Sequence, residues 1–323
     1  MQRSLQRVLR RRDRADPNDG RGPCAAASAS LDRNEGYCGA LSAASTPARH
    51  TDQRSCPTNS SGAPPTSFWE VRSSGDACAP LRELFADLTL DHAYAVQRIN
   101  VERALDTTPS ARVVGHKVGL TSQAVQSQLG VTEPDFGHLK SDMAIPDGGV
   151  IDLSGTFAPR AEAEIAFVLA DDLEGPGVTA ADVWSATDYL LPTIEIIDSR
   201  VRDWDIRIVD TVADNASSHA FVLGGPPVSP EGADLALAGM ALRVNGRIAS
   251  TGAGVACLGG PANAVAWLAN RLGAMGTHLP AGSIVLSGAL GPVVPIRPGD
   301  VLDAEIARVG TVRFRCAQSG EAE

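Results

Sequence analysis

Three acidic residues in two apolar segments have the types and spacing best suited to chemistry in this sequence. Glu162 and Glu164 lie within residues 159–169, PRAEAEIAFVL, where every residue after Glu164 is apolar. Because side chains alternate between the faces of a β-strand, a strand here would place both carboxylates on one face. Glu195 lies between two isoleucines in a second apolar segment, residues 190–200. The sequence therefore predicts three carboxylates at the edge of a buried core.

Buried carboxylates need a counter-charge. An ionised carboxylate left unpaired in a low dielectric costs several kcal/mol, and no Lys or Arg follows Glu164 on its face of the predicted strand. Three carboxylates without cysteine or a suitably spaced histidine form a hard, oxygen-rich site, which suits Mg²⁺ or Mn²⁺ better than Zn²⁺. An isolated Glu-x-Glu pair more often belongs to a solvated strand face, but the apolar flanks and Glu195 favour a metal site.

Lys117 is the first candidate for proton chemistry beside these carboxylates. It is one of only two lysines, whereas every other basic residue apart from histidine is arginine. Because arginine effectively cannot give up its proton, a lysine in the predicted strand 112–120 indicates a group that shares one. A surface lysine at a strand end is an equally good interpretation. Asp135 and Asp142 lie in a predicted loop, residues 131–147, where acids either face a site or satisfy turns.

Small polar residues near the predicted strand ends are candidates for substrate binding. Ser217 and Ser218 close a donor-rich segment, residues 203–218, which could hold a substrate carboxylate or form serine turns. Ser287 and Gly288 follow an apolar run and precede a glycine-rich loop, which makes them a candidate anion clamp.

Many short strands with few helices predict an α+β fold rich in β-structure. Predicted helices lie within residues 81–101 (capped by Asp91), 179–190 (capped by Thr179) and 261–272, and Asn245-Gly246 predicts a type I′ hairpin turn. The sequence contains no GxGxxG, Walker, GxSxG or HExxH motif, so nucleotide cofactors and serine hydrolase chemistry are unsupported.

Composition separates the first residues from the rest. Residues 1–66 are rich in Ser, Ala, Pro, Gly and Arg with almost no apolar periodicity, and we expect a disordered low-complexity extension. The net charge is −10, and residues 1–75 hold 11 arginines but seven acids, so the remainder is strongly acidic and nucleic acid is not expected as a partner. No segment is apolar enough for a membrane span. Six cysteines without CxxC spacing fit a reducing compartment, and we expect a cytoplasmic location.

Five stretches, taken in order, resemble one known family. They are GHKVGLTS, QLGVTEPDFGHL, PRAEAEIAFVL, PTIEIIDSRVRDWDIRIVDTVADNAS and SGALGP, and they cover roughly residues 78–316. They are similar to the fumarylacetoacetate hydrolase superfamily, and within it to the 2-hydroxypenta-2,4-dienoate (2-oxopent-4-enoate) hydratases. The resemblance implies a mixed-sheet β-roll with a few flanking helices as a metal-dependent catalytic domain over residues 111–318, after an N-terminal helical segment at 67–110. It also implies a homo-oligomer with a divalent metal held by Glu162, Glu164 and Glu195.

The activity implied by the resemblance is hydration of 2-hydroxypenta-2,4-dienoate to 4-hydroxy-2-oxopentanoate during meta-cleavage of aromatic compounds. Lys117 would stabilise or share the proton of an enolate oxygen, Asp135 would act as acid and base, and the positioning residues would be Asp142, Ser217, Ser218, Ser287 and Gly288. Alternatives are decarboxylation of 2-oxo-3-hexenedioate, C–C bond hydrolysis of an acylpyruvate, and a non-catalytic partner subunit. The family also suggests association with a pathway decarboxylase or aldolase.

Overall fold

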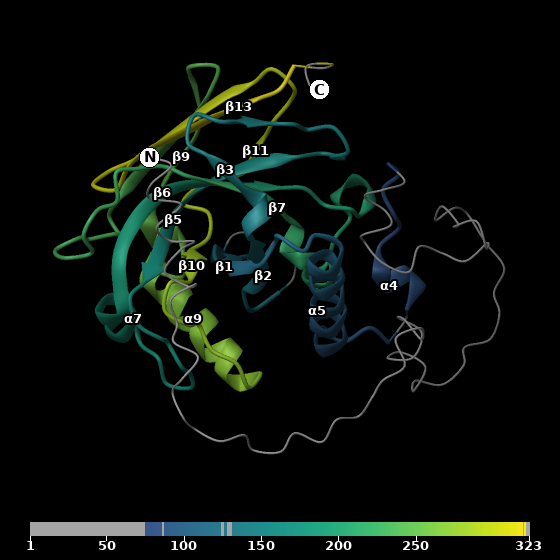
Figure 1. The fold of residues 1–323 in the computed structure, drawn as a ribbon, viewed down its shortest axis with the longest axis horizontal. Helices are drawn as coiled ribbons and strands as arrows, with labels where there is room; N and C mark the ends of the chain where they lie inside the picture. The colour runs from purple at the N-terminus through teal and green to yellow at the C-terminus, as the bar shows by residue number, and fades with distance from the viewer. Residues whose placement is uncertain (1–74, 86, 124–125, 128–130, 319, 321–323) are drawn as a thin grey trace.

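The computed structural model describes residues 75–318 and 320, except 86, 124–125 and 128–130 (Figure 1). The predicted disordered extension at residues 1–66 lies outside the described residues. The described part contains an eight-stranded sheet and a five-stranded sheet with a few helices. This agrees with the predicted α+β class.

The larger sheet has the strand order β2-β1-β10-β5-β6-β7-β3, and β11 pairs with β5. Its strands are β1 Val113–Gly119, β2 Asp135–Lys140, β3 Ala144–Pro146, β5 Arg160–Leu169, β6 Thr187–Ile197, β7 Ser218–Leu223, β10 Ile284–Leu286 and β11 Val294–Pro295. The smaller sheet, of order β4-β13-β12-β8-β9, contains β4 Val150–Ile151, β8 Gly239–Val244, β9 Arg247–Ala253, β12 Val301–Ile306 and β13 Gly310–Cys316.

The larger sheet is curled into a roll. Lys117 on β1 lies 3.4 Å from Glu195 on β6, although β10 and β5 run between these strands. Three strand spacings would separate them by roughly 14 Å in a flat sheet. The curl therefore brings distant strands together around one interior.

The interior of the roll has an apolar part and a polar end. The inward face of β5 carries Glu162, Glu164, Ala166 and Val168 in that order. The last two belong to a buried apolar cluster that also holds Leu139, Leu191, Phe221, Ile284 and Leu286. The carboxylates therefore lie at the end of the roll where β5 begins, above an apolar floor.

Helices and the second sheet cover the outside of the roll (Figure 1). They are α4 Leu81–Leu84, α5 Leu90–Thr107, α7 Ala180–Ala186, α8 Ile208–Ala213 and α9 Pro261–Ala274, with short 3₁₀ turns η2 Ser141–Met143, η3 Arg202–Trp204, η4 Asn215–Ser217 and η5 Gly254–Ala256. Strands β12 and β13 pack on β6, and α9 packs on β1. Both faces of β5 and β6 are thus buried, as their apolar runs predict.

Two details of the predicted helices are corrected by the structure. Helix α5 is capped by Thr89 and not by Asp91, because the Thr89 hydroxyl accepts from the His92 amide in a capping box. Helix α7 has Thr179 as its cap, as predicted, but ends at Ala186 and not near residue 190, because β6 begins at the next residue.

The predicted hairpin turn is present between β8 and β9. Asn245 and Gly246 have φ values of 52° and 75°, as a type I′ turn requires at both central positions. Among the helices of the described residues, none is both long and apolar enough to cross a membrane.

Candidate metal centre and active site

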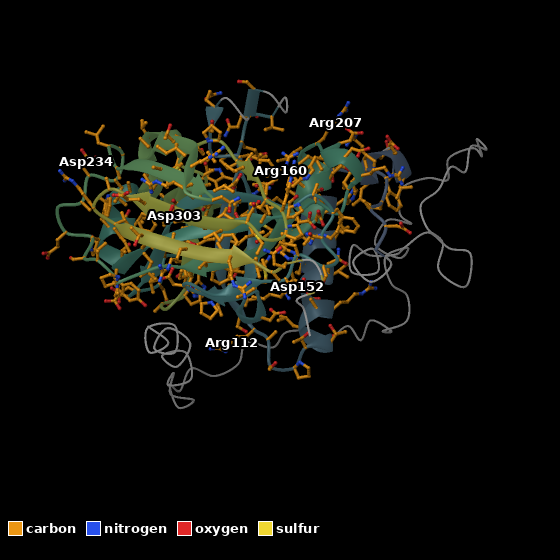
Figure 2. All side chains as sticks on the ribbon, turned by 90° about the horizontal axis from the view of Figure 1, so that it is seen from above. Arg112, Asp152, Arg160, Arg207, Asp234 and Asp303 are labelled. Carbon is orange, nitrogen blue, oxygen red and sulfur yellow. The ribbon has the colours of Figure 1, made fainter. Side chains whose placement is uncertain are left out.

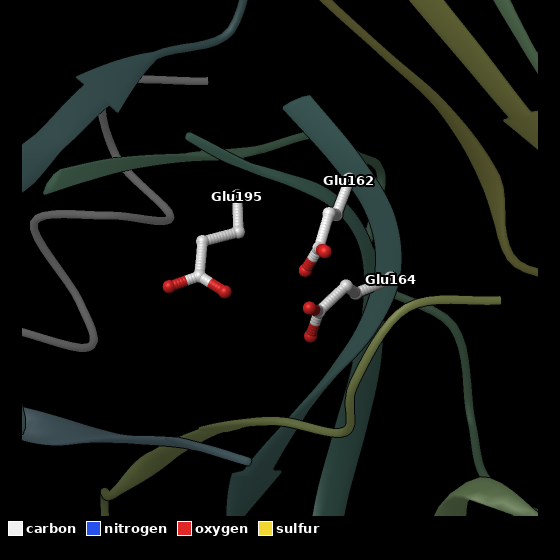
Figure 3. A group of neighbouring side chains, drawn as sticks. All are labelled: Glu162, Glu164 and Glu195. Carbon is white, nitrogen blue, oxygen red and sulfur yellow. The ribbon is translucent and has the colours of Figure 1, made fainter. Parts of the chain in front are cut away.

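The three glutamates converge from two neighbouring strands. Glu162 on β5 and Glu195 on β6 are direct partners in the antiparallel ladder, and Glu164 opposes Thr193 two positions further along. Each glutamate offers an oxygen atom, and these three oxygens lie within 4.8 Å of one another. Figure 3 shows the carboxylate of Glu195 facing those of Glu162 and Glu164 across a common space. The spacing allows one small cation to contact all three residues.

Burial makes these carboxylates poor anions when no cation is present. It raises the pKa of Glu162 to about 7, against the attraction of Lys117. Burial, reinforced by Glu195 and Glu162, raises the pKa of Glu164 well above its usual range. Burial also raises the pKa of Glu195, opposed by Lys117 and by the nearby Ser218 hydroxyl. A divalent cation between them would remove this penalty.

The hydrogen bonds of the glutamates leave room for metal coordination. The Gly288 amide donates to Glu164 Oε2 at 2.8 Å. Glu164 Oε1 and both Glu195 oxygens are buried and accept no hydrogen bond of normal geometry from the described residues. Buried polar atoms normally have partners. An oxygen-only set with free acceptor atoms therefore fits a hard divalent cation such as Mg²⁺ or Mn²⁺.

Lys117 supplies the positive charge that is missing from the following residues of β5. Its Nζ lies 3.4 Å from Glu195 Oε2, and the residue is only 4% exposed, so the surface-lysine interpretation is wrong. Burial alone would lower its pKa, but Glu195 and Asp135 more than compensate and raise it. Lys117 is therefore a charged hydrogen-bond donor in the metal-free protein.

Asp135 lies beside Lys117 at the same end of the roll. It is 1% exposed and pairs with Gly119 in the β1–β2 ladder. A Cβ atom at Gly119 would lie 2.2 Å from Asp135 Oδ1 and 3.4 Å from Lys117 Nζ, so both side chains occupy the space in front of this glycine. Burial raises the pKa of Asp135, whereas Lys117 and the hydrogen bond from Thr211 lower it. The predicted loop at 131–147 is wrong for residues 135–140, which form β2.

The predicted binding residues occupy different places. Ser218 is a neighbour of Glu195, and the buried hydroxyls of Ser217 and Ser287 have no hydrogen-bond partner of normal geometry among the described residues. The Gly288 amide already donates to Glu164. Of the predicted anion clamp, Ser287 therefore has the hydroxyl that is better able to bind a ligand. Asp142 lies beyond the opposite end of β2 and pairs with Lys140 at 2.9 Å, so the structure does not bring it to the glutamates.

Residues Asn215, Ala216 and Ser217 form a strained turn that positions the serines. All three have positive φ values of 55°, 51° and 56°, a conformation that costs of order 1–3 kcal/mol each in non-glycine residues. Asn215 holds the turn to β2, because its side chain accepts from the His138 amide at 2.8 Å and donates to the His138 carbonyl at 3.0 Å. No local sequence signal predicted this contact between distant segments.

A separate cavity of about 60 Å³ lies behind this turn. Its lining includes Lys140, Arg200, Asn215 and Ser218 but none of the three glutamates. Ser218 is therefore shared between the wall of the cavity and the surroundings of Glu195.

Arg160 was missed by the sequence reasoning, although a signal was present. It precedes Glu162 by two residues and so shares the face of the two glutamates on β5. Its guanidinium lies 4.2 Å from the centre of the Trp204 ring. A counter-charge on this strand face can precede the glutamates as well as follow them.

Comparison with known proteins identifies the relatives of this site. Residues 113–317 match the sequence profile of the fumarylacetoacetate (FAA) hydrolase C-terminal domain. The chain belongs to the fumarylacetoacetate hydrolase family. This membership and the mixed sheets confirm the predicted fold and the resemblance on which it rested.

Within this family, three relatives that resemble the chain over most of its length bear on its function. It is 52% identical over 247 residues to the 2-keto-4-pentenoate hydratase of Paraburkholderia xenovorans, covering 76% of this chain and 91% of the relative. It is 46% identical over 246 residues to the 2-hydroxyhexa-2,4-dienoate hydratase of Comamonas testosteroni, covering 76% and 92%. The solved 4-oxalocrotonate decarboxylase from Pseudomonas putida G7, complexed with magnesium and adipate, is 38% identical with a TM-score of 0.74, covering 77% and 94%.

Proposed function

We propose that this protein is a metal-dependent hydratase that adds water to 2-hydroxypenta-2,4-dienoate (2-oxopent-4-enoate) and forms 4-hydroxy-2-oxopentanoate. The observation that carries the proposal is the convergence of three glutamates, Lys117 and Asp135 at one end of the roll. Relatives named as hydratases share about half of their residues with this chain over nine-tenths of their length. The reaction adds one water without a change of redox state, so it needs no nucleotide or flavin.

Each group at the polar end can be given a chemical role. A divalent ion held by Glu162, Glu164 and Glu195, which we propose to be Mg²⁺ or Mn²⁺, would act as a Lewis acid toward the 2-oxygen and carboxylate of the substrate. The Lys117 ammonium would donate a hydrogen bond to the negative charge that develops on the 2-oxygen during ketonisation. These interactions would stabilise the enolate in a site from which bulk water is largely excluded.

Asp135 is the proposed acid and base. Its Oδ1 is buried and accepts no hydrogen bond of normal geometry from the described residues, while Oδ2 accepts from Thr211 Oγ1 at 3.4 Å. Oδ1 is therefore the atom to which we assign proton transfer to the diene carbon and from the attacking water. Ser217, Ser218 and Ser287, whose buried hydroxyls make no hydrogen bond of normal geometry with the described residues, are proposed to orient the substrate; Asp142 has no proposed contact with it.

The proposal is tested by following the ultraviolet absorbance of freshly generated 2-hydroxypenta-2,4-dienoate with the purified protein. We expect loss of the diene in Mg²⁺, inhibition by EDTA, and 4-hydroxy-2-oxopentanoate as the product. Glu164→Gln should reduce turnover by at least about a hundredfold, whereas Glu174→Gln, an exposed acid on a loop, should not change it. Metal-independent turnover, or a different product, would contradict the proposal.

Decarboxylation of 2-oxo-3-hexenedioate is the second candidate, because the solved decarboxylase shares the fold at 38% identity. Both reactions use an enolate of a 2-oxo acid, so the metal centre alone does not separate them. Release of CO₂ from 2-oxo-3-hexenedioate without hydration of the pentadienoate would favour the decarboxylase. Metal binding without turnover of either substrate would favour a non-catalytic partner subunit.

We also propose that the protein is a homo-oligomer in the cytoplasm. Leu237 and Val255 are 77% and 56% exposed and lie near each other, since the Val255 amide donates to the carbonyl of Ala236. An exposed apolar pair of this kind suits a contact between subunits. Light scattering after size exclusion would test it, with Leu237→Glu expected to weaken assembly. Association with a pathway decarboxylase or aldolase stays a prediction.

A further inference from the structure

Arg160 lies at the end of β5 that is next to the most exposed of the three glutamates. It begins β5, and its side chain leaves the strand on the same face as Glu162 and Glu164. Of the three metal-site glutamates only Glu162, the one nearest Arg160 in sequence, is partly exposed. In the view from above, Arg160 lies over the body of the fold, whereas Asp234 lies at its outline (Figure 2). A ligand that approaches the glutamates past Glu162 would therefore come close to Arg160.

The guanidinium of Arg160 stacks on an aromatic ring through its planar face, and its N–H groups lie around the edge of that face. It stacks on Trp204 at 4.2 Å, and the Trp204 indole N–H donates to the Ala158 carbonyl at 3.0 Å. Asp203 and Trp204 have positive φ values of 58° and 54°, so the ring is presented by a strained turn. Among the described residues, no carboxylate lies within ion-pair distance of Arg160. The N–H donors around the edge of a stacked guanidinium remain available for an anion.

The sum of the charges at the site also favours a further positive group once an anionic substrate is bound. Three carboxylates carry −3, while one divalent ion and Lys117 carry +3, so these groups sum to zero before an ionised Asp135 is counted. A substrate carboxylate would then make the occupied site negative. Arg160, which lies beside Glu162 and interacts with it electrostatically, is placed to offset this charge.

We propose that Arg160, positioned by Trp204, binds the carboxylate of the substrate at the entrance to the metal centre. This inference rests on the proposed function and adds that the site selects 2-oxo and 2-hydroxy acids over their uncharged analogues. Arg160 is thus a substrate-binding residue, and Trp204 is a positioning residue that acts through it. Arginine suits this role because its planar fork matches both oxygens of a carboxylate.

The test compares binding of 2-oxopentanoate, a saturated analogue that cannot be hydrated, with binding of 2-oxopentanamide, which lacks the carboxylate charge. Titration calorimetry of the intact chain in Mg²⁺ measures both. Arg160→Gln should weaken 2-oxopentanoate by about tenfold to a hundredfold, the usual effect of losing a charged hydrogen-bond pair, and should leave the amide unchanged. Arg160→Lys should lie between. Arg247→Gln, which removes an exposed arginine on β9, should have no effect on either ligand.

Variants of Trp204 test the positioning role. Trp204→Phe keeps an aromatic face and should bind 2-oxopentanoate nearly as well as the natural protein, whereas Trp204→Leu should lose several-fold. In turnover assays Arg160→Gln should raise KM with little change in kcat, because the residue acts on the carboxylate and not on the reacting carbons.

Equal losses for the acid and the amide would overturn the inference, since they would indicate a distorted site, and so would unchanged binding of the acid. Circular dichroism and the melting temperature identify a variant that fails to fold, and Arg160→Lys then carries the test. If the natural protein binds 2-oxopentanoate in an Arg160-dependent way but does not hydrate the dienoate, the proposed function fails while this inference stands.

Discussion

Without a bound metal ion, the stability of this protein should fall as the pH rises. In the metal-free protein burial raises the pKa of Glu162 to about 7, from an ordinary value of 4.5. Below pH 4.5 the carboxyl is protonated in the folded and the unfolded chain, so it contributes no penalty. Between pH 4.5 and 7 the unfolded chain ionises first, which lowers the free energy of unfolding. Glu164, whose pKa is also raised, should extend this loss to higher pH.

The size of the effect follows from the same values. A shift of the Glu162 pKa from 4.5 to about 7 lowers the free energy of unfolding by about 3 kcal/mol at pH above 7. Glu162 is partly exposed, and solvent screening reduces the effect to about 2 kcal/mol. For a folded region of this size, about 2 kcal/mol lowers the melting temperature by roughly 4–8 °C. Bound Mg²⁺ should reverse the loss, because it requires the ionised carboxylates.

The assay is a series of melting curves at pH 5 to 8 in EDTA and in Mg²⁺. We expect Mg²⁺ to stabilise the protein more at pH 8 than at pH 5. The matched control is Glu162→Gln, which cannot ionise at this position and should show a shallower fall between pH 5 and 8 without metal. The same pH slope in Glu162→Gln and the natural protein, or equal Mg²⁺ stabilisation at both ends of the range, would refute the reasoning.

Three substitutions give further expected outcomes. Asp135→Asn should reduce turnover of the dienoate by about a hundredfold to ten-thousandfold while calorimetry shows that 2-oxopentanoate still binds, and near-normal turnover would exclude the proposed proton transfer. Gly288→Ala should lower the melting temperature and the Mg²⁺ affinity measured by titration, because its Cβ would meet Thr121 Oγ1 at 2.4 Å and φ is +96°. Asn215→Ala should cost about 1–3 kcal/mol in urea unfolding, since it leaves the backbone groups of His138 unpaired; an unchanged unfolding midpoint would show that water replaces the amide.

The local parts of the site were predictable from sequence. Alternation in residues 159–169 assigned Glu162 and Glu164 to one strand face, and the apolar neighbours of Glu195 indicated a second buried strand. Both inferences needed only side-chain periodicity and the cost of burying charge. Their direct pairing across β5 and β6 depends on register, which these local patterns did not determine.

The contacts across the roll were beyond local reasoning. Lys117 reaches Glu195 because the sheet curls over β10 and β5, and curl is a property of the packed sheet. The sequence predicts a loop at Asp135 because glycine and proline lie in and around β2, whose residues are buried on both faces and lack a two-residue polar period. Asp142, equally acidic and nearby in sequence, is instead neutralised by Lys140.

The arrangement of the roll separates the tasks that a hydratase must combine. Below the glutamates the interior is filled by buried side chains such as Leu191, Phe221 and Leu286, so the site is closed from beneath by apolar packing. Of the three glutamates only Glu162 is partly exposed, and Arg160, which stacks on Trp204, precedes it on the same strand face. In the proposed reaction, the anionic substrate would therefore enter past Glu162 and Arg160. In the same proposed reaction, an enolate formed next to Lys117 would be bounded by this apolar cluster and would lie close to Asp135. For this reason we expect substitutions of Arg160 or Trp204 to alter substrate choice, and substitutions of Asp135 to alter turnover.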